Sequence, residues 1–344
     1  MTYALPIAFL ERDFAGPCEF PTFLEQPKLY RMRSFFLAVF GAMVLAASAQ
    51  AGTLSVPPAA TAGLEALYAG DQDAAIEIFQ KIQREQPEHP LGYILEVEAR
   101  WWTIYCSSAE FKYGMTDAWR RTKRAEDQPY FDLAQKANTL AEAQLRNAET
   151  AEMHFYAGMG QALIARLYSL RGENRAAARL GVPARAHFIR ALALDPGLAD
   201  ADLGIGLYNY YVDTLSGLAK ILRFFMGIPG GSKRDGVKQL EHAVASGALT
   251  QAEARFQLAK NLRNYDQDYH RALAVIEPLM EQYPSNPFFQ LLQGDLYAKL
   301  SRKEEAALCF RVAAALPVRD PQCRQRIQEL TRAALSALGP SFVP

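Results

Sequence analysis

The chain has 344 residues, of which 50% are hydrophobic, and its 37 Lys and Arg residues balance 37 Asp and Glu residues. This length allows one large domain or two smaller ones. A net charge of zero excludes the typical nucleic-acid binder, which carries a basic excess or stripe. The densest basic cluster, residues 118–127, ends in Glu126 and Asp127, which favours a solvated loop or helix end over a phosphate patch. Abundant Ala and Leu with few β-branched runs favour helix.

The N-terminal part predicts a secretory signal peptide over residues 32–51. Arg33 gives it a basic start, an apolar run extends from Phe35 to Ala47, and Ala47-Ser48-Ala49 offers a small-residue cleavage site. This layout is typical of an exported protein, and we expect a periplasmic or envelope location. Residues 1–31 do not belong to the layout, so we expect the native chain to start at residue 32. The alternative is an uncleaved anchor.

The four cysteines give no disulfide framework. Cys18 precedes the expected start, and no Cys-x-x-Cys motif for zinc or redox chemistry occurs. For Cys106, Cys309 and Cys323, buried free thiols are the default expectation. The alternative is a disulfide between Cys309 and Cys323, since they fall on neighbouring predicted helices.

A helix-pair pattern recurs along the rest of the chain. In residues 65–90, Gly70 closes one helix, Ala75 and Phe79 share a face of the next, and Pro87 ends it. Similar patterns occur in residues 184–197, 256–287 and 291–317. Small residues let two helices pack closely, and proline stops a helix because it lacks the N–H group. One such pair cannot bury its own apolar face, so neighbouring pairs are expected to stack.

These segments resemble tetratricopeptide repeats (TPRs), as found in exported bacterial proteins. The resemblance implies an all-α, right-handed α-solenoid of helix–turn–helix repeats over residues 56–340, with insertions. The expected units are 56–89, 90–148, 152–198, 199–249, 253–286 and 287–320, followed by a capping helix at 321–338. In the second unit a loop of about twenty residues is expected to separate the two helices. In the third, an insertion is expected around residues 171–181.

The Gly-x-Gly pair Gly204 and Gly206 is interpreted as a helix-packing feature. A dinucleotide fingerprint needs a preceding strand and a third glycine, and the sequence offers neither. Gly160 and Gly206 are expected at equivalent repeat positions, where the paired helix crosses.

In the TPR family, certain positions of each first helix line a concave groove. Carried over by register, they predict partner-binding side chains that include two aromatic pairs: Trp101, Trp102, Leu207, Tyr210, Tyr211, Asn261, Asn264 and Tyr265. Aromatic residues with polar tips are common binding anchors. The alternative is that these side chains pack against the inserted segments.

The fourth unit contains an apolar inserted helix at residues 214–227. Its apolar stripe predicts contact with a membrane surface through Leu218, Leu222, Phe224 and Phe225. The alternative is packing on the solenoid. Residues 200–245 also resemble, weakly, a segment of a eukaryotic family of divergent TPR proteins linked to lipid-droplet and inclusion clearance.

No catalytic constellation stands out. The five histidines are scattered, and neither a Gly-x-Ser-x-Gly motif nor a phosphate loop is present. We therefore expect a non-enzymatic protein without metal or cofactor, which binds a protein or peptide and no nucleic acid. A membrane-surface protein and a glycan- or polymer-binding solenoid are the alternatives.

Overall fold

The computed structural model describes residues 54–225 and 227–342, so residues 1–31 and the whole expected signal peptide, residues 32–51, lie outside the described part. Helices and strands follow one another as α1 (Pro58–Tyr68), α2 (Gln72–Glu85), α3 (Leu91–Ser108), β1 (Ala109–Lys112), β2 (Met115–Ala118), η1 (Ala125–Asp127), α4 (Gln128–Leu145), α5 (Ala151–Leu170), α6 (Asn174–Leu194), α7 (Ala201–Thr214), α8 (Gly217–Phe225), α9 (Lys233–Ser246), α10 (Gln251–Asn261), η2 (Leu262–Asp266), α11 (Tyr269–Gln282), α12 (Pro287–Lys299), α13 (Lys303–Ala315), α14 (Pro321–Leu338) and η3 (Pro340–Phe342).

Helix starts follow local capping chemistry. The side chains of Asp71, Thr150 and Asn286 accept hydrogen bonds from backbone N–H groups in the first turns of α2, α5 and α12. Such caps satisfy donors that have no partner inside the helix. Proline in the first turn of α12 and α14 fits because its missing N–H is not needed there.

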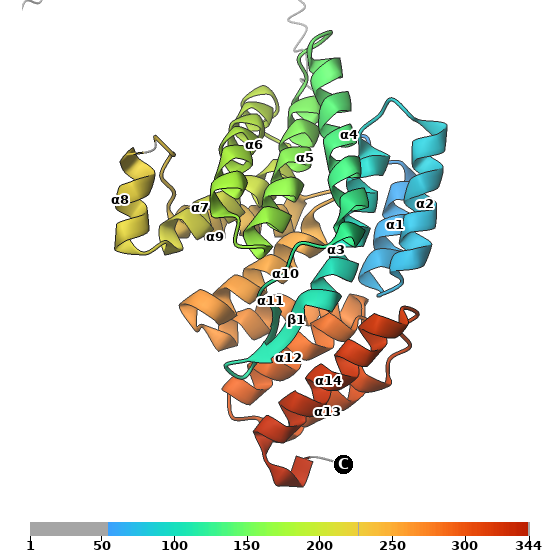
Figure 1. Cartoon of the computed structure of the whole chain (residues 1–344), viewed down its shortest axis with the longest axis vertical. Helices are drawn as coiled ribbons and strands as arrows, with labels where there is room; N and C mark the ends of the chain where they lie inside the picture. Colours follow the sequence, from blue (N-terminus) through green and yellow to red (C-terminus); the bar gives the residue numbers. More distant parts are fainter. Residues whose placement is uncertain (1–53, 226, 343–344) are drawn as a thin grey trace, which may run out of the picture. The chain divides into compact units, whose positions relative to one another are not determined.

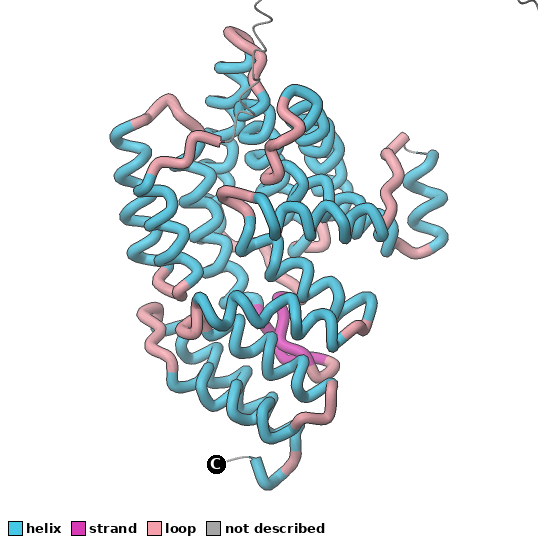
Figure 2. The backbone as a smooth tube through the Cα atoms, turned by 180° about the vertical axis from the view of Figure 1, so that it is seen from behind, coloured by secondary structure: helices cyan, strands magenta, loops and turns pink. Residues whose placement is uncertain are grey.

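Consecutive helices pack in pairs, and the pairs stack (Figure 1). The pairs are α1 with α2, α3 with α4, α5 with α6, α7 with α9, α10 with α11, and α12 with α13, and α14 packs on α13. This sequential pairing confirms the expected solenoid of helix pairs. The short helix α8 interrupts the fourth pair and lies at the edge of the stack in both overall views (Figures 1 and 2).

Two inserted segments differ from expectation. The loop expected after α3 contains an antiparallel hairpin in which β1 pairs with β2, Ala109 opposite Ala118 (Figure 2). Tyr113 and Gly114 form its two-residue turn, both with positive φ, which matches the twist of a hairpin. The insertion expected around residues 171–181 is largely part of α6, a continuous helix that contains Pro183. Its Ala-rich sequence favours helix.

The ring of Phe188 joins the third and fourth pairs. A Cβ atom at Gly158 would lie 2.8 Å from Phe188 Cε1, and one at Gly204 would lie 2.1 Å from Cε2. Gly206 contacts the paired helix as expected, because its Cβ would lie 3.0 Å from the carbonyl oxygen of Gly236. The equivalence with Gly160 is wrong: Gly160 faces Ala134 and Asn138 of α4, the preceding helix. Gly158 is the residue that meets the paired helix α6.

The first helix pair also contacts the C-terminal pairs. Asn286 Nδ2 donates to the carbonyl oxygen of Tyr68 at 2.9 Å, and Ser285 Oγ donates to that of Ala69 at 2.7 Å. Arg319 and Asp71 form an ion pair at 2.9 Å. The stack is therefore joined between its first unit and its last units.

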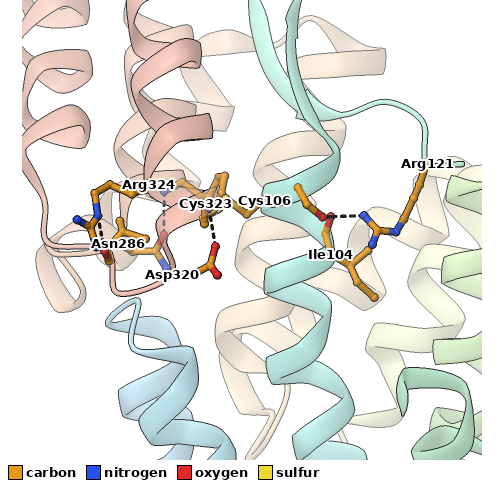
Figure 3. The surroundings of a disulfide bond; sticks show 10 residues. Ile104, Cys106, Arg121, Asn286, Asp320, Cys323 and Arg324 are labelled. Atoms are coloured by element: carbon orange, nitrogen blue, oxygen red, sulfur yellow. Dashed lines mark hydrogen bonds between the residues drawn. A yellow bond between two sulfur atoms is a disulfide. The ribbon is translucent and has the colours of Figure 1, made fainter. Parts of the chain in front are cut away.

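A disulfide links α3 to the capping helix α14. Cys106 and Cys323 are bonded, with Cα atoms 5.6 Å apart and a sequence separation of 217 (Figure 3). Cys309 is a buried free thiol. The expectation of free thiols is therefore wrong for Cys106 and Cys323, and so is the alternative pairing of Cys309 with Cys323. The reason is that α14 folds back on α3 and on the hairpin and brings Cys323 to Cys106.

Candidate functional site

The inner face of the stack is filled by aromatic side chains rather than open. Trp102 is 1% exposed and its ring packs against Phe256, Phe288 and Phe289. Trp101 is also buried, and the guanidinium carbon of Arg166 lies 4.1 Å from its ring centroid. Register predicts both tryptophans as groove anchors. In the structure both side chains belong to the core. Rings from α10 and α12 cover Trp102, and the guanidinium group of Arg166 covers Trp101.

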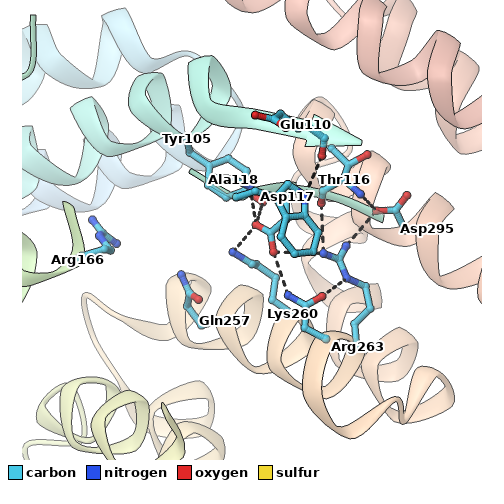
Figure 4. Close-up of polar contacts among 12 residues, drawn as sticks. Tyr105, Glu110, Thr116, Asp117, Ala118, Arg166, Gln257, Lys260, Arg263 and Asp295 are labelled. Atoms are coloured by element: carbon cyan, nitrogen blue, oxygen red, sulfur yellow. Dashed lines mark hydrogen bonds and ion pairs between the residues drawn. The ribbon is translucent and has the colours of Figure 1, made fainter. Parts of the chain in front are cut away.

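The β-hairpin contributes a buried carboxylate to this inner face (Figure 4). Asp117 accepts hydrogen bonds from the hydroxyl of Tyr105 at 2.9 Å and from Nδ2 of Asn264 at 3.0 Å. It also pairs with Lys260 at 2.8 Å and with Arg263 at 3.4 Å. Burial would raise the pKa of Asp117, but Lys260 and Arg263 outweigh it and lower that pKa. Asn264, an expected groove residue, therefore fixes the hairpin.

A second carboxylate, Asp295, meets the same arginine from α12. Arg263 donates to Asp295 at 3.0 Å, and the backbone N–H of Thr116 donates to Asp295 at 2.5 Å. Asp295 is fully buried, and this burial raises its pKa to about 7 despite the opposing effect of Arg263. Two carboxylates thus share one buried guanidinium.

Arg166 makes a third polar bridge, between helices far apart in the chain. It donates to Glu98 of α3 at 2.7 Å and to Glu253 of α10 at 3.2 Å. Burial raises the pKa of Glu98, while Arg166 acts in the opposite direction. Breaking one member of such a group leaves an uncompensated buried charge, which is strongly destabilising. The polar groups of the inner face therefore hold the stack together.

Two of the expected groove tyrosines remain accessible. Tyr211 is 37% exposed and Tyr265 is 50% exposed, with ring centroids 6.0 Å apart. We call this pair the tyrosine edge. Tyr210 and Asn261 are buried, and Leu207 packs partly buried against the core. Tyr210 donates its hydroxyl to the carbonyl oxygen of Asn261 at 3.0 Å and to the Asp266 carboxylate.

A π-helical turn positions the tyrosine edge. Residues Leu262–Asp266 form this turn after α10, and Gln267 ends it in the left-handed region with φ of 54°. Arg263 points into the core, whereas Tyr265, two residues later, is exposed. Such turns are rare and occur frequently at functional sites. No pattern in the sequence indicated this turn.

The inserted helix α8 is linked to α7 by Lys220, whereas Arg223 bonds within the inserted segment. Lys220 pairs with Asp213 of α7 at 2.9 Å, and Arg223 donates to the carbonyl oxygen of Ile228 at 2.9 Å. Ile221 is 56% exposed and Phe224 is 76% exposed. The side chains of Leu218, Leu222 and Phe225 lie outside the described part of the structure.

The described residues also include a surface cleft. A surface cleft of about 640 Å³ lies between α2, α3 and α4, with charges of both signs from Arg84, Glu96, Arg100 and Asp132. Within residues 54–342, no group of three or more His, Cys, Asp or Glu side chains is arranged to hold a metal ion. No helix in the described ranges is long and apolar enough to cross a membrane.

No family model and no curated protein matches the chain. Solved structures with similar folds include a thermophilic TPR protein of Thermus thermophilus, at 15% identity over 73% of this chain and 97% of that one, with a TM-score of 0.37. YrrB, described as a TPR protein with an unusual peptide-binding site, is 18% identical over 74% and 100%, with a TM-score of 0.33. Yeast Tom70 is 10% identical over 81% and 88%, with a TM-score of 0.27. At these identities the likeness concerns the fold alone.

Proposed function

We propose that this protein is a non-catalytic scaffold that binds a protein or peptide partner at the tyrosine edge. The observation that carries the proposal is the exposure of Tyr211 and Tyr265 on a framework that holds them rigidly. Tyr211 contacts the buried ring of Tyr210 at a centroid distance of 5.9 Å, and Tyr265 lies within the π-helical turn. Exposed aromatic side chains on a rigid support lose little entropy on binding and bury a large area.

Site-specific photo-crosslinking in cells tests this proposal. A photoreactive residue at position 211 or 265 should give a discrete protein adduct that mass spectrometry identifies. Position 113 is the matched control, because Tyr113 is a tyrosine with 79% exposure on the hairpin turn. An adduct pattern at 113 identical to that at 211 and 265 would mean that exposure alone explains the capture, and would sink the proposal.

We further propose that the protein acts outside the cytoplasm. Two independent features support this location: the signal-peptide layout of residues 32–51 and the disulfide between Cys106 and Cys323. Disulfides persist in exported proteins and are rare in the cytosol. Mass spectrometry of the protein from fractionated cells should find it cleaved near residue 49 and oxidised at Cys106. An intact, reduced chain in the cytosolic fraction would contradict the proposal.

A second candidate function is attachment to a membrane surface through α8. The observation that favours it is the exposure of Ile221, an apolar residue of this helix next to Lys220, which pairs with Asp213 of α7. Exposed apolar side chains are typical of amphipathic helices that lie in the membrane interface. Liposome sedimentation should show binding that Ile221→Glu abolishes. Leu308→Glu is the control, because Leu308 is 60% exposed on α13; equal losses in both variants would contradict a role of α8.

A further inference from the structure

Two histidines on neighbouring helices face each other outside the inner face. His154 of α5 and His187 of α6 have their Nδ1 atoms 2.9 Å apart. The Nε2 atom of His154 lies 3.0 Å from Glu149, and that of His187 lies 3.2 Å from Glu142 of α4. The resulting chain of contacts, which we call the histidine clamp, joins α4, α5 and α6.

Counting protons shows which charge state suits the histidine clamp. Each contact with a carboxylate needs an N–H donor at Nε2, and the contact between the rings needs one further N–H at Nδ1. Two neutral rings carry one N–H each, which supplies two of the three donors. One added proton supplies the third, so the pair with a single positive charge satisfies every contact. A second added proton places an N–H on both facing Nδ1 atoms, which then repel each other.

The surrounding charges fit a single positive charge on the pair. Glu142 and Glu149 flank the rings, and Arg190 of α6 holds Glu149 through two hydrogen bonds of 2.7 Å. Glu152, which also lies on α5, has its carboxylate 3.9 Å from Nε2 of a different histidine, His89. Burial lowers the pKa of His187, Glu142 opposes this effect, and a charge on His154 adds to it. The last proton therefore binds only under acidic conditions.

We propose that the histidine clamp is an acid-sensitive switch, closed by one shared proton and opened by a second. His187 precedes Phe188, the ring that packs between Gly158 and Gly204. Opening of the clamp consequently loosens the junction between the third and fourth helix pairs. The sign of the pH dependence follows from the linkage between proton binding and stability. A histidine whose pKa is lower in the folded state than in the unfolded chain lowers the free energy of unfolding as the pH falls below about 6.5.

Hydrogen exchange measured by mass spectrometry on the full chain tests the switch. After correction for the intrinsic exchange rate, exchange in peptides covering α6 should rise up to about tenfold per pH unit below pH 6.5, the slope for one proton taken up on opening. His187→Gln, which keeps an amide but binds no proton, should remove this pH dependence. His242→Gln is the matched control, because His242 contacts one carboxylate, Asp202, at 2.7 Å, and it should leave the dependence intact.

Nuclear magnetic resonance of the ring nitrogens in the unmodified chain gives an independent readout, which does not depend on the folding of any variant. Followed from pH 8 to pH 4, the ring nitrogens should pass through a state in which one ring of the pair is protonated on both nitrogens and the other on Nε2 alone. Two rings that gain their protons without this intermediate state, or exchange in α6 that is independent of pH, would overturn the proposal. An equal pH dependence in the wild type and in His187→Gln would do the same.

Discussion

The ring of Phe188 packs so tightly against Gly204 that a methyl group at position 204 would lie 2.1 Å from its Cε2 atom. Glycine is thus required at this junction by lack of space.

We expect Gly204→Ala to lower the free energy of unfolding by about 1–3 kcal/mol, the usual cost of overpacking a core. Gly181→Ala is the control, because nothing lies within 4 Å of a Cβ atom there. In a helix this change should raise stability by up to about 1 kcal/mol. Urea denaturation measures both variants. Equal effects of the two substitutions would mean that space at position 204 does not matter.

The disulfide should stabilise the protein strongly because it closes a long loop. For a sequence separation of 217, the chain-entropy argument gives about 5 kcal/mol. We expect Cys106→Ala and Cys323→Ala each to cost about 2–5 kcal/mol, and the double variant to cost no more than the larger single loss, since the bond is removed once. Chemical denaturation measures this cycle. Additive losses would show that each cysteine acts on its own.

Asp295 should make stability depend on pH. Its pKa is raised to about 7 by burial, so the folded state holds a proton that the unfolded chain releases near its ordinary value. Stability is therefore lost as the pH rises from about 4 to about 7, by up to about 1.4 kcal/mol per pH unit. Asp295→Asn cannot titrate. The stability of the wild type relative to this variant, from denaturation at pH 5, 6, 7 and 8, should fall up to pH 7 and then level off. A constant difference contradicts this expectation.

Tyr210 and Tyr265 should separate stability from binding. Tyr210→Phe removes the hydrogen bonds to Asn261 and Asp266 and should cost about 1–3 kcal/mol. Tyr265→Ala changes an exposed side chain and should alter stability by no more than about 0.5 kcal/mol, yet it should weaken capture of the partner. Thermal denaturation measures the stability of both variants, and the yield of crosslinked partner measures their binding. A stable Tyr210→Phe variant would show that these bonds contribute little.

The helix pairs were predictable because their signals are local. Residues 291–317, for example, showed the small residues and the aromatic residue of a helix pair, and in the structure a Cβ atom at Gly294 would lie 2.5 Å from the ring of Phe310 on the paired helix. The hairpin had a weaker signal, the Tyr113-Gly114 turn between two short segments, which lacks the usual Asn-Gly or Asp-Gly.

The accessible part of the groove could not be predicted from register alone. Register places Trp102 and Tyr211 on the same face of the stack, but exposure depends on what else reaches that face. Rings from α10 and α12 cover Trp102, and Tyr211 lies beyond them. The disulfide partner of Cys323 depended likewise on the packing of α14 against α3, a contact between distant segments that no local pattern encodes.

The contacts of Asn286 and Ser285 with the first helix pair change how the chain is expected to fold. An open repeat array is held by neighbour contacts, so folding can begin at any repeat and spread, and terminal repeats unravel first. Here residues more than 200 positions apart must meet before the structure is complete. Non-local contacts slow folding, since the entropy of closing the loop is lost before the contact forms. The chain should accordingly fold slowly for a helical protein and unfold without fraying from its ends.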